Sequence, residues 1–154
     1  YETVGMGALK YFMLKVDPKK RMLFDPQESI DFNGNTGPFI QYTYARIQSI
    51  LRKNNGDIKI DEDSNITDKE RALIISLLEF PKTIQEAANS FSPALIANYA
   101  YEVVKDFNSY YQSTSILGAD SPSIISFRVA LSQQTAKVIK SSMSLLGINV
   151  PQRM

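Results

Sequence analysis

Residues 31–53 have the sequence DFNGNTGPFIQYTYARIQSILRK, in which a glycine-rich loop leads directly into a long amphipathic helix. Gly34 and Gly37 permit left-handed backbone in the loop, and Pro38 suits the first turn of a helix, where its missing N–H costs no hydrogen bond. Apolar side chains then recur at helical spacing on one stripe: Ile40, Tyr44, Ile47 and Leu51. The stretch therefore predicts a helix that ends near residue 53 and packs one face on a core.

The same stretch gathers groups suited to single-stranded RNA near the start of that helix. Phe39, Tyr42 and Arg46 lie on or near an adjoining stripe, close to the loop at residues 33–37. Aromatic rings can stack on unpaired bases, and free backbone N–H and C=O groups can bind base edges. The residues alone also fit a capped core helix after a turn, so both hypotheses stand at this point.

The composition indicates one globular domain without a membrane-spanning segment. The chain has 154 residues, 44% of them hydrophobic, and no uninterrupted apolar run reaches the length of about eighteen residues that a membrane helix needs. Cysteine and histidine are both absent, which excludes a disulfide framework, a His/Cys zinc site and a Ser-His-Asp triad. The first residues, Tyr1-Glu2-Thr3, are typical of neither a chain start nor a signal peptide, so we expect a longer parent chain.

Charge is distributed unevenly along the chain although the net charge is only +1. Residues 57–120 hold 5 Lys and Arg against 11 Asp and Glu, whereas residues 121–154 hold no acidic residue and four basic ones: Arg128, Lys137, Lys140 and Arg153. A basic last segment suits a polyanionic partner, and it is equally typical of an ordinary solvated helix face. The acidic cluster of Asp61, Glu62 and Asp63 does not follow EF-hand spacing, and we interpret it as a solvated loop.

Helical signals recur over the rest of the chain. Helices are expected at residues 2–16, 67–80, 82–89, 92–111 and 122–146, and Thr67 with Glu70 forms a capping box at the start of the second. The last helix is expected to turn five apolar side chains inward: Ile124, Phe127, Leu131, Val138 and Leu145. Since strand alternation is absent, the predicted fold is all-α, a bundle of five to six helices with a non-helical C-terminal tail folded back on it.

Four blocks of sequence follow one another along nearly the whole chain: DPKKRMLFDPQESIDF at 17–32, GNTGPFIQYTYARIQSILRK at 34–53, FNSYY at 107–111 and LLGINVPQRM at 145–154. Together they resemble the C-terminal anticodon-binding (DALR-type) domain of bacterial arginyl-tRNA synthetases. The resemblance implies that residues 1–16 form a helix at the junction with a catalytic domain. Residues 17–154 would then form the anticodon-binding domain.

The resemblance also implies which positions meet the anticodon loop of the tRNA: Asn35, Thr36, Gly37, Phe39, Tyr42, Arg46, Tyr111 and Met154. In the family the loop residues shape themselves around the anticodon, the aromatic residues face or stack on bases, the arginine pairs with phosphate or braces the loop, and the terminal methionine lies nearby. Weaker phosphate contacts are expected at Lys137, Lys140 and Arg153.

Two positions depart from the family pattern. Members often have Tyr where this chain has Phe39, and some have Trp where this chain has Ser115. Phe39 has no hydroxyl to form the hydrogen bond that a tyrosine could make there, and Ser115 cannot supply the tryptophan contact.

The family activity implied by the resemblance is the ATP-dependent joining of arginine to its tRNA, through an arginyl-adenylate, by a class I synthetase. The HIGH-type and KMSKS-type motifs of such catalytic domains are absent here, so we expect this chain alone to be inactive and to bind no cofactor, with ATP and Mg²⁺ used by the parent. The implied partners are an arginine tRNA and the catalytic domain of the same chain, in a cytoplasmic monomer.

A helical protein-interaction module without RNA binding is the alternative hypothesis, in which the aromatic helix ends anchor another protein. The two differ in where the aromatic side chains lie. RNA binding requires Phe39, Tyr42 and Tyr111 to converge with Met154 on one basic, concave face.

Overall fold

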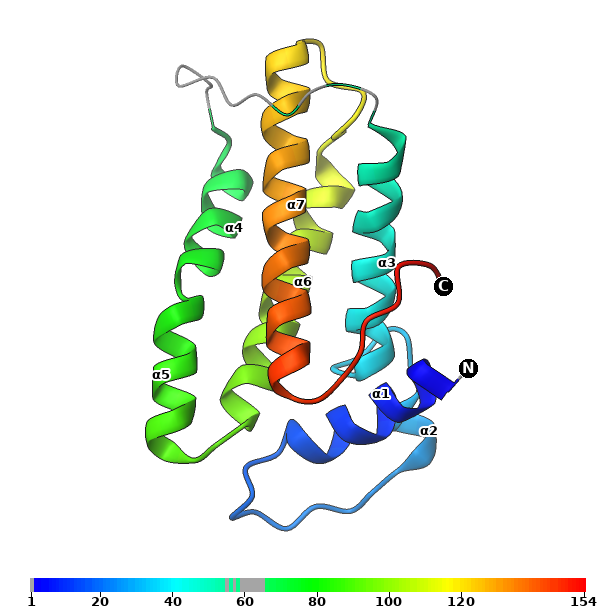
Figure 1. Cartoon of the computed structure of the whole chain (residues 1–154), viewed down its shortest axis with the longest axis vertical. Helices are drawn as coiled ribbons and strands as arrows, with labels where there is room; N and C mark the ends of the chain where they lie inside the picture. The colour runs from blue at the N-terminus through cyan, green and yellow to red at the C-terminus, as the bar shows by residue number, and fades with distance from the viewer. Residues whose placement is uncertain (1, 55, 57, 59–65) are drawn as a thin grey trace.

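The computed structural model describes residues 2–54, 56, 58 and 66–154, and within these residues the chain forms helices and no strand (Figure 1). The helices are α1 (Glu2–Leu14), α2 (Pro26–Ser29), α3 (Gly37–Lys53), α4 (Asp68–Leu78), α5 (Phe80–Ser90), α6 (Ala94–Ser113) and α7 (Pro122–Leu145). Since α2 is a single turn, six longer helices make up the described bundle. The predicted all-α bundle of five to six helices is therefore confirmed. The acidic cluster of Asp61, Glu62 and Asp63 lies outside the described residues.

Helices α3, α4 and α7 begin where the sequence signals place them, whereas α5 begins two residues earlier and α6 two residues later than expected. At α3 the Thr36 hydroxyl accepts a hydrogen bond from the Phe39 N–H at 3.3 Å, and Pro38 occupies the first turn. At α4 the predicted capping box is complete: the Thr67 N–H donates to the Glu70 carboxylate at 2.8 Å, and the Glu70 N–H donates back to the Thr67 hydroxyl at 3.3 Å. These caps satisfy N–H groups that the first helical turn leaves without partners.

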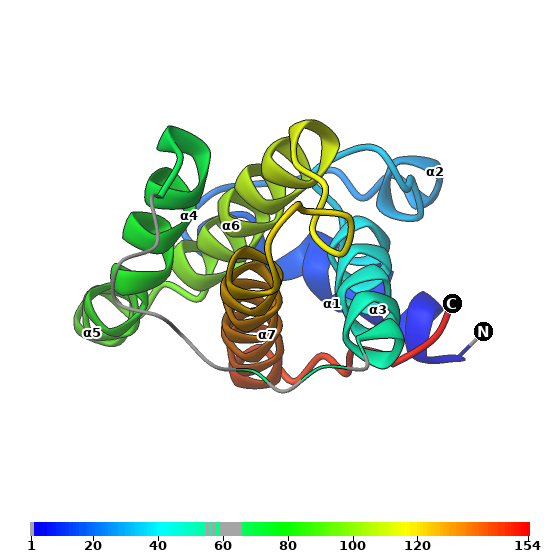
Figure 2. The ribbon, with the colours of Figure 1, turned by 90° about the horizontal axis from the view of Figure 1, so that it is seen from above.

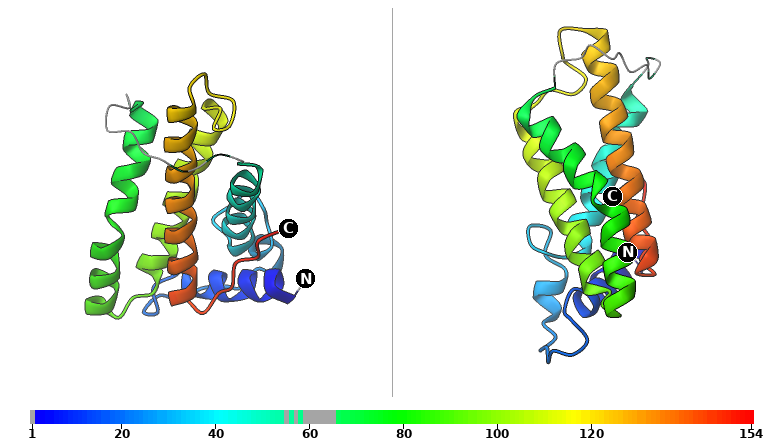
Figure 3. Two further views of the ribbon diagram at one scale, coloured as in Figure 1. Left: turned by 45° about the horizontal axis from the view of Figure 1, so that its top comes forward. Right: turned by 90° about the vertical axis from the view of Figure 1, so that its left-hand side faces the viewer.

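The helices form an upright bundle with α1 lying across its lower end (Figures 1 and 3). Seen from above, α6 and α7 stand at the centre, α4 and α5 flank them on one side, and α3 flanks them on the other (Figure 2). The core fills the space between these elements, and its largest fully buried side chains include Tyr11, Ile40, Ile47, Phe107, Tyr110, Ile139 and Met143. Burying these apolar surfaces is the main stabilising contribution to the fold. No described helix has the length and apolar character needed to cross a lipid bilayer.

The apolar stripe of α3 is buried as predicted. Ile40, Tyr44 and Ile47 lie in the core, and Leu51 packs against it from the edge. With this stripe fixed inward, the neighbouring stripe of α3 faces out beside α6.

The predicted inward face of α7 is confirmed at Leu131, which is buried, and in part at Phe127, which packs against the core. Leu145 is exposed, and Ile124, Phe127 and Val138 are only partly buried. The inward side also carries Ile139 and Met143 and a set of smaller residues: Ser126, Val129, Ser132, Thr135, Ala136 and Ser142. Within this set the hydroxyls of Ser132, Thr135 and Ser142 donate to carbonyls four residues earlier in the same helix, so α7 can pack closely with no cost from these buried hydroxyls.

Helical spacing in residues 2–16 predicts one apolar side formed by Leu9, Phe12, Met13 and Val16, and this prediction is partly wrong. Phe12 is buried, but Leu9 and Met13 are exposed, and the side packed on α3 is formed by Gly7, Ala8 and Tyr11. The small residues allow α1 to approach very closely: a Cβ on Gly37 would lie 2.4 Å from the Gly7 carbonyl oxygen. Neither Gly34 nor Gly37 has the expected left-handed backbone, so close packing is the reason for glycine at position 37.

The tail after α7, residues 146–154, folds back on the bundle as predicted. Gly147 leaves the helix with φ +68°, a conformation that favours glycine. Leu146 and Ile148 are buried, and Val150 packs against the core. The tail then runs along α3 and brings the C-terminus close to the start of α1 (Figures 1 and 3).

Candidate nucleic-acid interface

Arg46 of α3 lies between two tyrosine rings on the surface of the bundle. Its guanidinium carbon is 5.0 Å from the ring centre of Tyr42, one turn earlier on α3, and 5.3 Å from that of Tyr111 on α6. Both rings reach solvent, with 43% of Tyr42 and 38% of Tyr111 exposed. The arrangement presents two planar aromatic groups on either side of a cation.

Groups behind this surface hold its side chains in place. Asn108 of α6 accepts a hydrogen bond from Arg46 Nη1 at 2.9 Å and donates to the buried Thr43 hydroxyl at 3.0 Å. Buried Phe107 stacks against Tyr111, with ring centres 6.1 Å apart and planes 19° apart. The exposed groups are thus positioned before any ligand arrives, which lowers the conformational cost of binding.

A first hollow opens on the Tyr42 side of Arg46. It measures roughly 840 Å³, and its walls come from α1, the loop before α3, α3 itself and the tail: Thr3, Val4, Phe32, Asn33, Tyr42, Arg46, Pro151, Arg153 and Met154. Phe32 meets Tyr42 edge to face with ring centres 6.3 Å apart. Four of the predicted contacts therefore line one space: Tyr42, Arg46, Arg153 and Met154.

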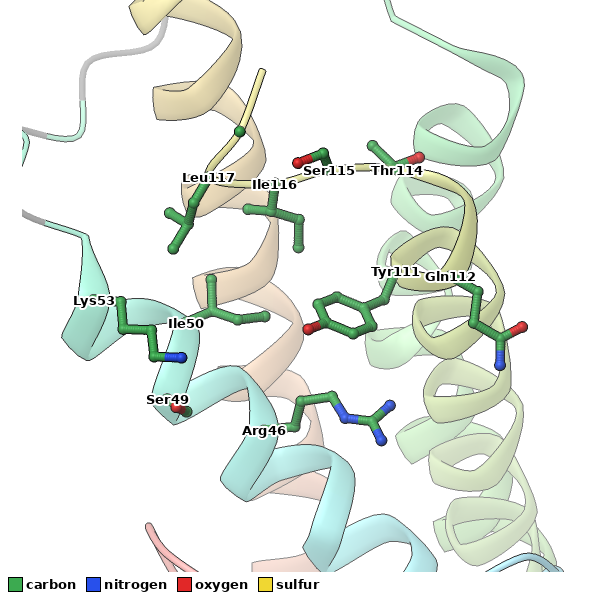
Figure 4. A pocket seen from close by; sticks show the side chains of 11 residues that line it. Arg46, Ser49, Ile50, Lys53, Tyr111, Gln112, Thr114, Ser115, Ile116 and Leu117 are labelled. Atoms are coloured by element: carbon green, nitrogen blue, oxygen red, sulfur yellow. The ribbon is translucent and has the colours of Figure 1, made fainter.

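A second hollow opens on the Tyr111 side of Arg46 (Figure 4). It measures roughly 700 Å³ and is lined by Arg46, Ser49, Ile50, Lys53, Tyr111, Gln112 and residues 114–118. In Figure 4 the Tyr111 ring from α6 and the Lys53 side chain from α3 point toward one another across it, with Arg46 below. The Arg46 side chain belongs to both hollows, and it forms the ridge between them.

The charge around these hollows is positive. A smaller hollow of roughly 400 Å³ adjoins the first and brings Arg52 beside Arg46 and Arg153. Among the described residues, no Asp or Glu lines any of these three hollows. Such a surface attracts a polyanion and leaves its cations available to pair with it.

The predicted loop contacts lie elsewhere. Asn35 is held from inside the protein: its side-chain oxygen is 2.6 Å from the Tyr11 hydroxyl, and its carbonyl accepts from Lys15 at 3.1 Å. Thr36 is buried as the cap of α3, and Gly37 is pressed against α1. The loop residue that reaches the first hollow is Asn33.

Phe39 and the two lysines of α7 are also outside the hollows. Phe39 packs between α3 and α6 with its ring centre 5.9 Å from that of Tyr101, beside the core. Lys137 and Lys140 are exposed on α7, which lies behind α3 and α6 in the view of Figure 4. Of the three predicted phosphate contacts, Arg153 alone lines a described hollow.

Sequence reasoning missed four residues of this surface: Phe32, Asn33, Lys53 and Asn108. A signal for Lys53 was present, because Tyr42, Arg46, Ser49 and Lys53 follow one another at spacings of three or four along α3. Asn108, by contrast, lies on α6, and its bond to Arg46 joins positions 62 residues apart. Only the packing of two helices could reveal that contact.

Comparison with known proteins shows which family has a sequence like that of this chain. A profile described as the DALR anticodon binding domain matches residues 40–154. Arginine–tRNA ligase of Flavobacterium psychrophilum is 58% identical over all of this chain, and that of Parabacteroides distasonis is 52% identical over 98% of it. The chain spans about a quarter, 26%, of the length of both relatives.

Solved structures agree in fold. Arginyl-tRNA synthetase of Thermus thermophilus superposes with a TM-score of 0.93 at 35% identity, over 99% of this chain and 27% of that one. The Plasmodium falciparum enzyme superposes with a TM-score of 0.88 at 27% identity, over the same shares.

Proposed function

The chain belongs to the DALR anticodon-binding domain family of arginyl-tRNA synthetases, and from this premise we propose that it holds a tRNA anticodon loop on the ridge and hollows around Arg46. The observation that carries the proposal is the arginine held between two exposed tyrosines, with a hollow on either side and no carboxylate side chain lining either hollow within the described residues.

The physical chemistry of the surface fits a splayed RNA loop. Bases stack on exposed aromatic faces at about 1–3 kcal/mol each, and Tyr42 and Tyr111 offer such faces at separate points. Arg46, Lys53 and Arg153 would pair with phosphates between the stacked bases. Binding by this chain alone should then be in the micromolar range and should weaken as salt is added.

The loop before α3 would act by supporting the site. Asn35, Thr36 and Gly37 place Asn33 and Phe32 at the first hollow through their contacts with α1 and α3, and Phe39 holds α3 against α6. Met154 would lie against the bound loop, since half of its surface, 48%, is exposed in the first hollow. Lys137 and Lys140 would contribute only longer-range attraction.

The proposal extends to the longer enzyme that relatives of this chain represent. That enzyme would be a cytoplasmic monomer that joins arginine to an arginine tRNA, with ATP and Mg²⁺ bound outside this chain. This chain would contribute tRNA positioning and no chemical step. A helical protein-docking module is less well supported, because several cations surround the hollows whereas the centre of a protein–protein interface is depleted of charged residues.

A titration tests base reading directly. A fluorescent hairpin with the anticodon stem-loop of an arginine tRNA should bind, and a hairpin with a changed middle anticodon base should bind more weakly. Both should lose affinity as salt is raised, because phosphate contacts release counterions. Equal affinity for the two hairpins would remove the claim that bases are read.

Replacing the stacking ring tests the surface itself. Tyr111→Ala should lower hairpin affinity by about tenfold or more, since one base loses its stacking partner. The fold should persist because the ring is partly exposed. The control is Phe91→Ala, which removes an aromatic ring that is 87% exposed and lines none of these hollows. Equal losses in the two variants would contradict a site at Tyr111.

A further inference from the structure

The C-terminal tail, residues 146–154, depends on side chains of other helices for its backbone hydrogen bonds. Three side chains donate hydrogen bonds to carbonyls spaced along the tail: Lys10 Nζ to Gly147 at 2.7 Å, Gln41 Nε2 to Asn149 at 2.7 Å, and Arg52 Nη1 to Gln152 at 3.1 Å. Non-helical backbone needs such partners, because no helical ladder satisfies it. The tail therefore has a defined path along α3.

Gln41 differs from the other two donors because it is completely buried, whereas Lys10 and Arg52 bond at exposed sites. Its second N–H donates to the Thr3 carbonyl of α1 at 3.1 Å, so one amide joins the start of α1 to the tail. The Gln41 side-chain oxygen is buried and has no hydrogen-bond partner among the described residues. An unsatisfied buried oxygen costs stability. The stabilising hydrogen bonds of this amide are therefore the two that its N–H groups donate.

The Gln41 amide occupies the space that a side chain at position 7 of α1 would fill. A Cβ on Gly7 would lie 2.4 Å from Gln41 Nε2 and 2.8 Å from its amide carbon. Position 7 of α1 therefore has room only for glycine while the Gln41 amide is in place.

The two segments that Gln41 joins are two walls of the first hollow. Thr3 and Val4 of α1 form one wall, and Pro151, Arg153 and Met154 of the tail form the other. The next residue of α3 after Gln41 is Tyr42, which lines the same hollow. Gln41 thus lies beneath the hollow, while its neighbour in sequence faces into it.

We infer that Gln41 is a positioning residue for RNA binding: its buried amide holds the tail and the start of α1 at the separation from Tyr42 that the anticodon loop requires. The inference rests on the proposed function, because it assigns Gln41 a role at the same surface. Gln41 itself does not contact RNA, and it acts through Arg153 and Met154.

Gln41→Met, which keeps the length of the side chain and removes both donors, tests this role with two measurements. Release of Met154 by a carboxypeptidase should become faster, because the tail loses its buried bond. Affinity for the anticodon hairpin should fall by about tenfold, the upper range for one lost hydrogen bond. In a chain that ends at Val150, which keeps the α1 wall but lacks Arg153 and Met154, Gln41→Met should cause a smaller loss of affinity.

Two variants complete the design. Gln48→Met changes the same residue type two turns along α3 at a partly exposed position, and it should leave both measurements unchanged. Gly7→Ala displaces the Gln41 amide without removing it and should reproduce faster release and weaker binding. This second variant keeps the test decisive if Gln41→Met does not fold.

The outcomes separate this inference from the proposed function. Unchanged Met154 release in both Gln41→Met and Gly7→Ala would overturn it, and so would an equal loss of affinity from Gln41→Met in the full and shortened chains. If the unaltered chain binds no hairpin, the proposed function fails, whereas the release rate still reports whether Gln41 holds the tail.

Discussion

Arg46 and Arg128 are both partly buried arginines, and their surroundings differ in one respect. Arg128 donates to the carboxylate of Glu70 at 2.8 Å and to the Ser115 carbonyl at 2.8 Å. Arg46 has two tyrosine faces and the neutral Asn108 as partners, and no described carboxylate forms an ion pair with it. One positive charge is neutralised within the fold, and the other is positioned but left available. The comparison indicates that Arg128 serves stability and Arg46 serves binding.

The Glu70–Arg128 pair also explains why a carboxylate can be buried at the start of α4. Burial by itself would raise the pKa of the Glu70 carboxyl, but hydrogen bonds from Thr67 and Arg128 outweigh it and hold that pKa below its ordinary value. Glu70 therefore stays ionised, and it connects α4 to α7 while it caps its own helix.

Removing Glu70 should give the largest effect. Glu70→Ala leaves Arg128 without its partner and breaks the capping box, so the free energy of unfolding should fall by about 3 kcal/mol in urea denaturation. Hairpin affinity of the folded variant should not change, because Glu70 lines none of the three hollows. Two results would contradict the separate roles of Arg128 in stability and Arg46 in binding. One is a variant as stable as the unaltered chain, and the other is a folded variant that binds RNA less tightly.

Removing the charge of Arg46 should give an effect of intermediate size, and it should lower RNA affinity rather than stability. Arg46→Met should lower hairpin affinity by about tenfold and reduce the salt dependence of log Kd by about one unit, since one phosphate contact is lost. Unfolding free energy should change by less than about 1 kcal/mol. Arg71→Met, at an exposed position of α4, is the control and should alter neither quantity. An unchanged salt slope in Arg46→Met would mean that Arg46 meets no phosphate.

Lowering the pH should produce the smallest effect, a loss of unfolding free energy as Glu70 is protonated. Because the pKa of Glu70 is lowered in the folded chain, its contribution to stability is full above the ordinary carboxyl pKa and is lost as the pH falls through the lowered value. Between about pH 7 and pH 3 the unaltered chain should therefore lose more unfolding free energy than Glu70→Gln does. Parallel stability curves for the two proteins would contradict the role given to Glu70.

Local signals predicted the helices well. Pro38, the Thr67–Glu70 capping box and Gly147 act through their own backbone, so their effect can be read from a few neighbouring residues. The inward stripe of α3 was equally readable because its polar and apolar faces are distinct. The α7 prediction failed in part because apolar residues occur around much of that helix, and small serines and threonines share its buried side with Ile139 and Met143.

The candidate site was only partly predictable. The resemblance pointed to Tyr42, Arg46, Tyr111, Arg153 and Met154, and the structure brings these five side chains to one pair of adjoining hollows. The same resemblance pointed to Phe39, which packs against Tyr101 instead. Whether its ring contacts RNA in any state stays a prediction, as does contact by Asn35, Thr36 and Gly37.

From residues alone one obtains an all-α chain, the ends of its helices and a family resemblance, since each depends on short-range backbone chemistry or on matched motifs. Only the tertiary structure shows that the ring of Tyr42, and not that of Phe39, is exposed to solvent. Helical periodicity places them on neighbouring stripes, but it does not say which stripe α6 covers and which one the tail leaves open. That outcome depends on contacts between residues many positions apart, such as Gln41 with Asn149 and Arg46 with Asn108.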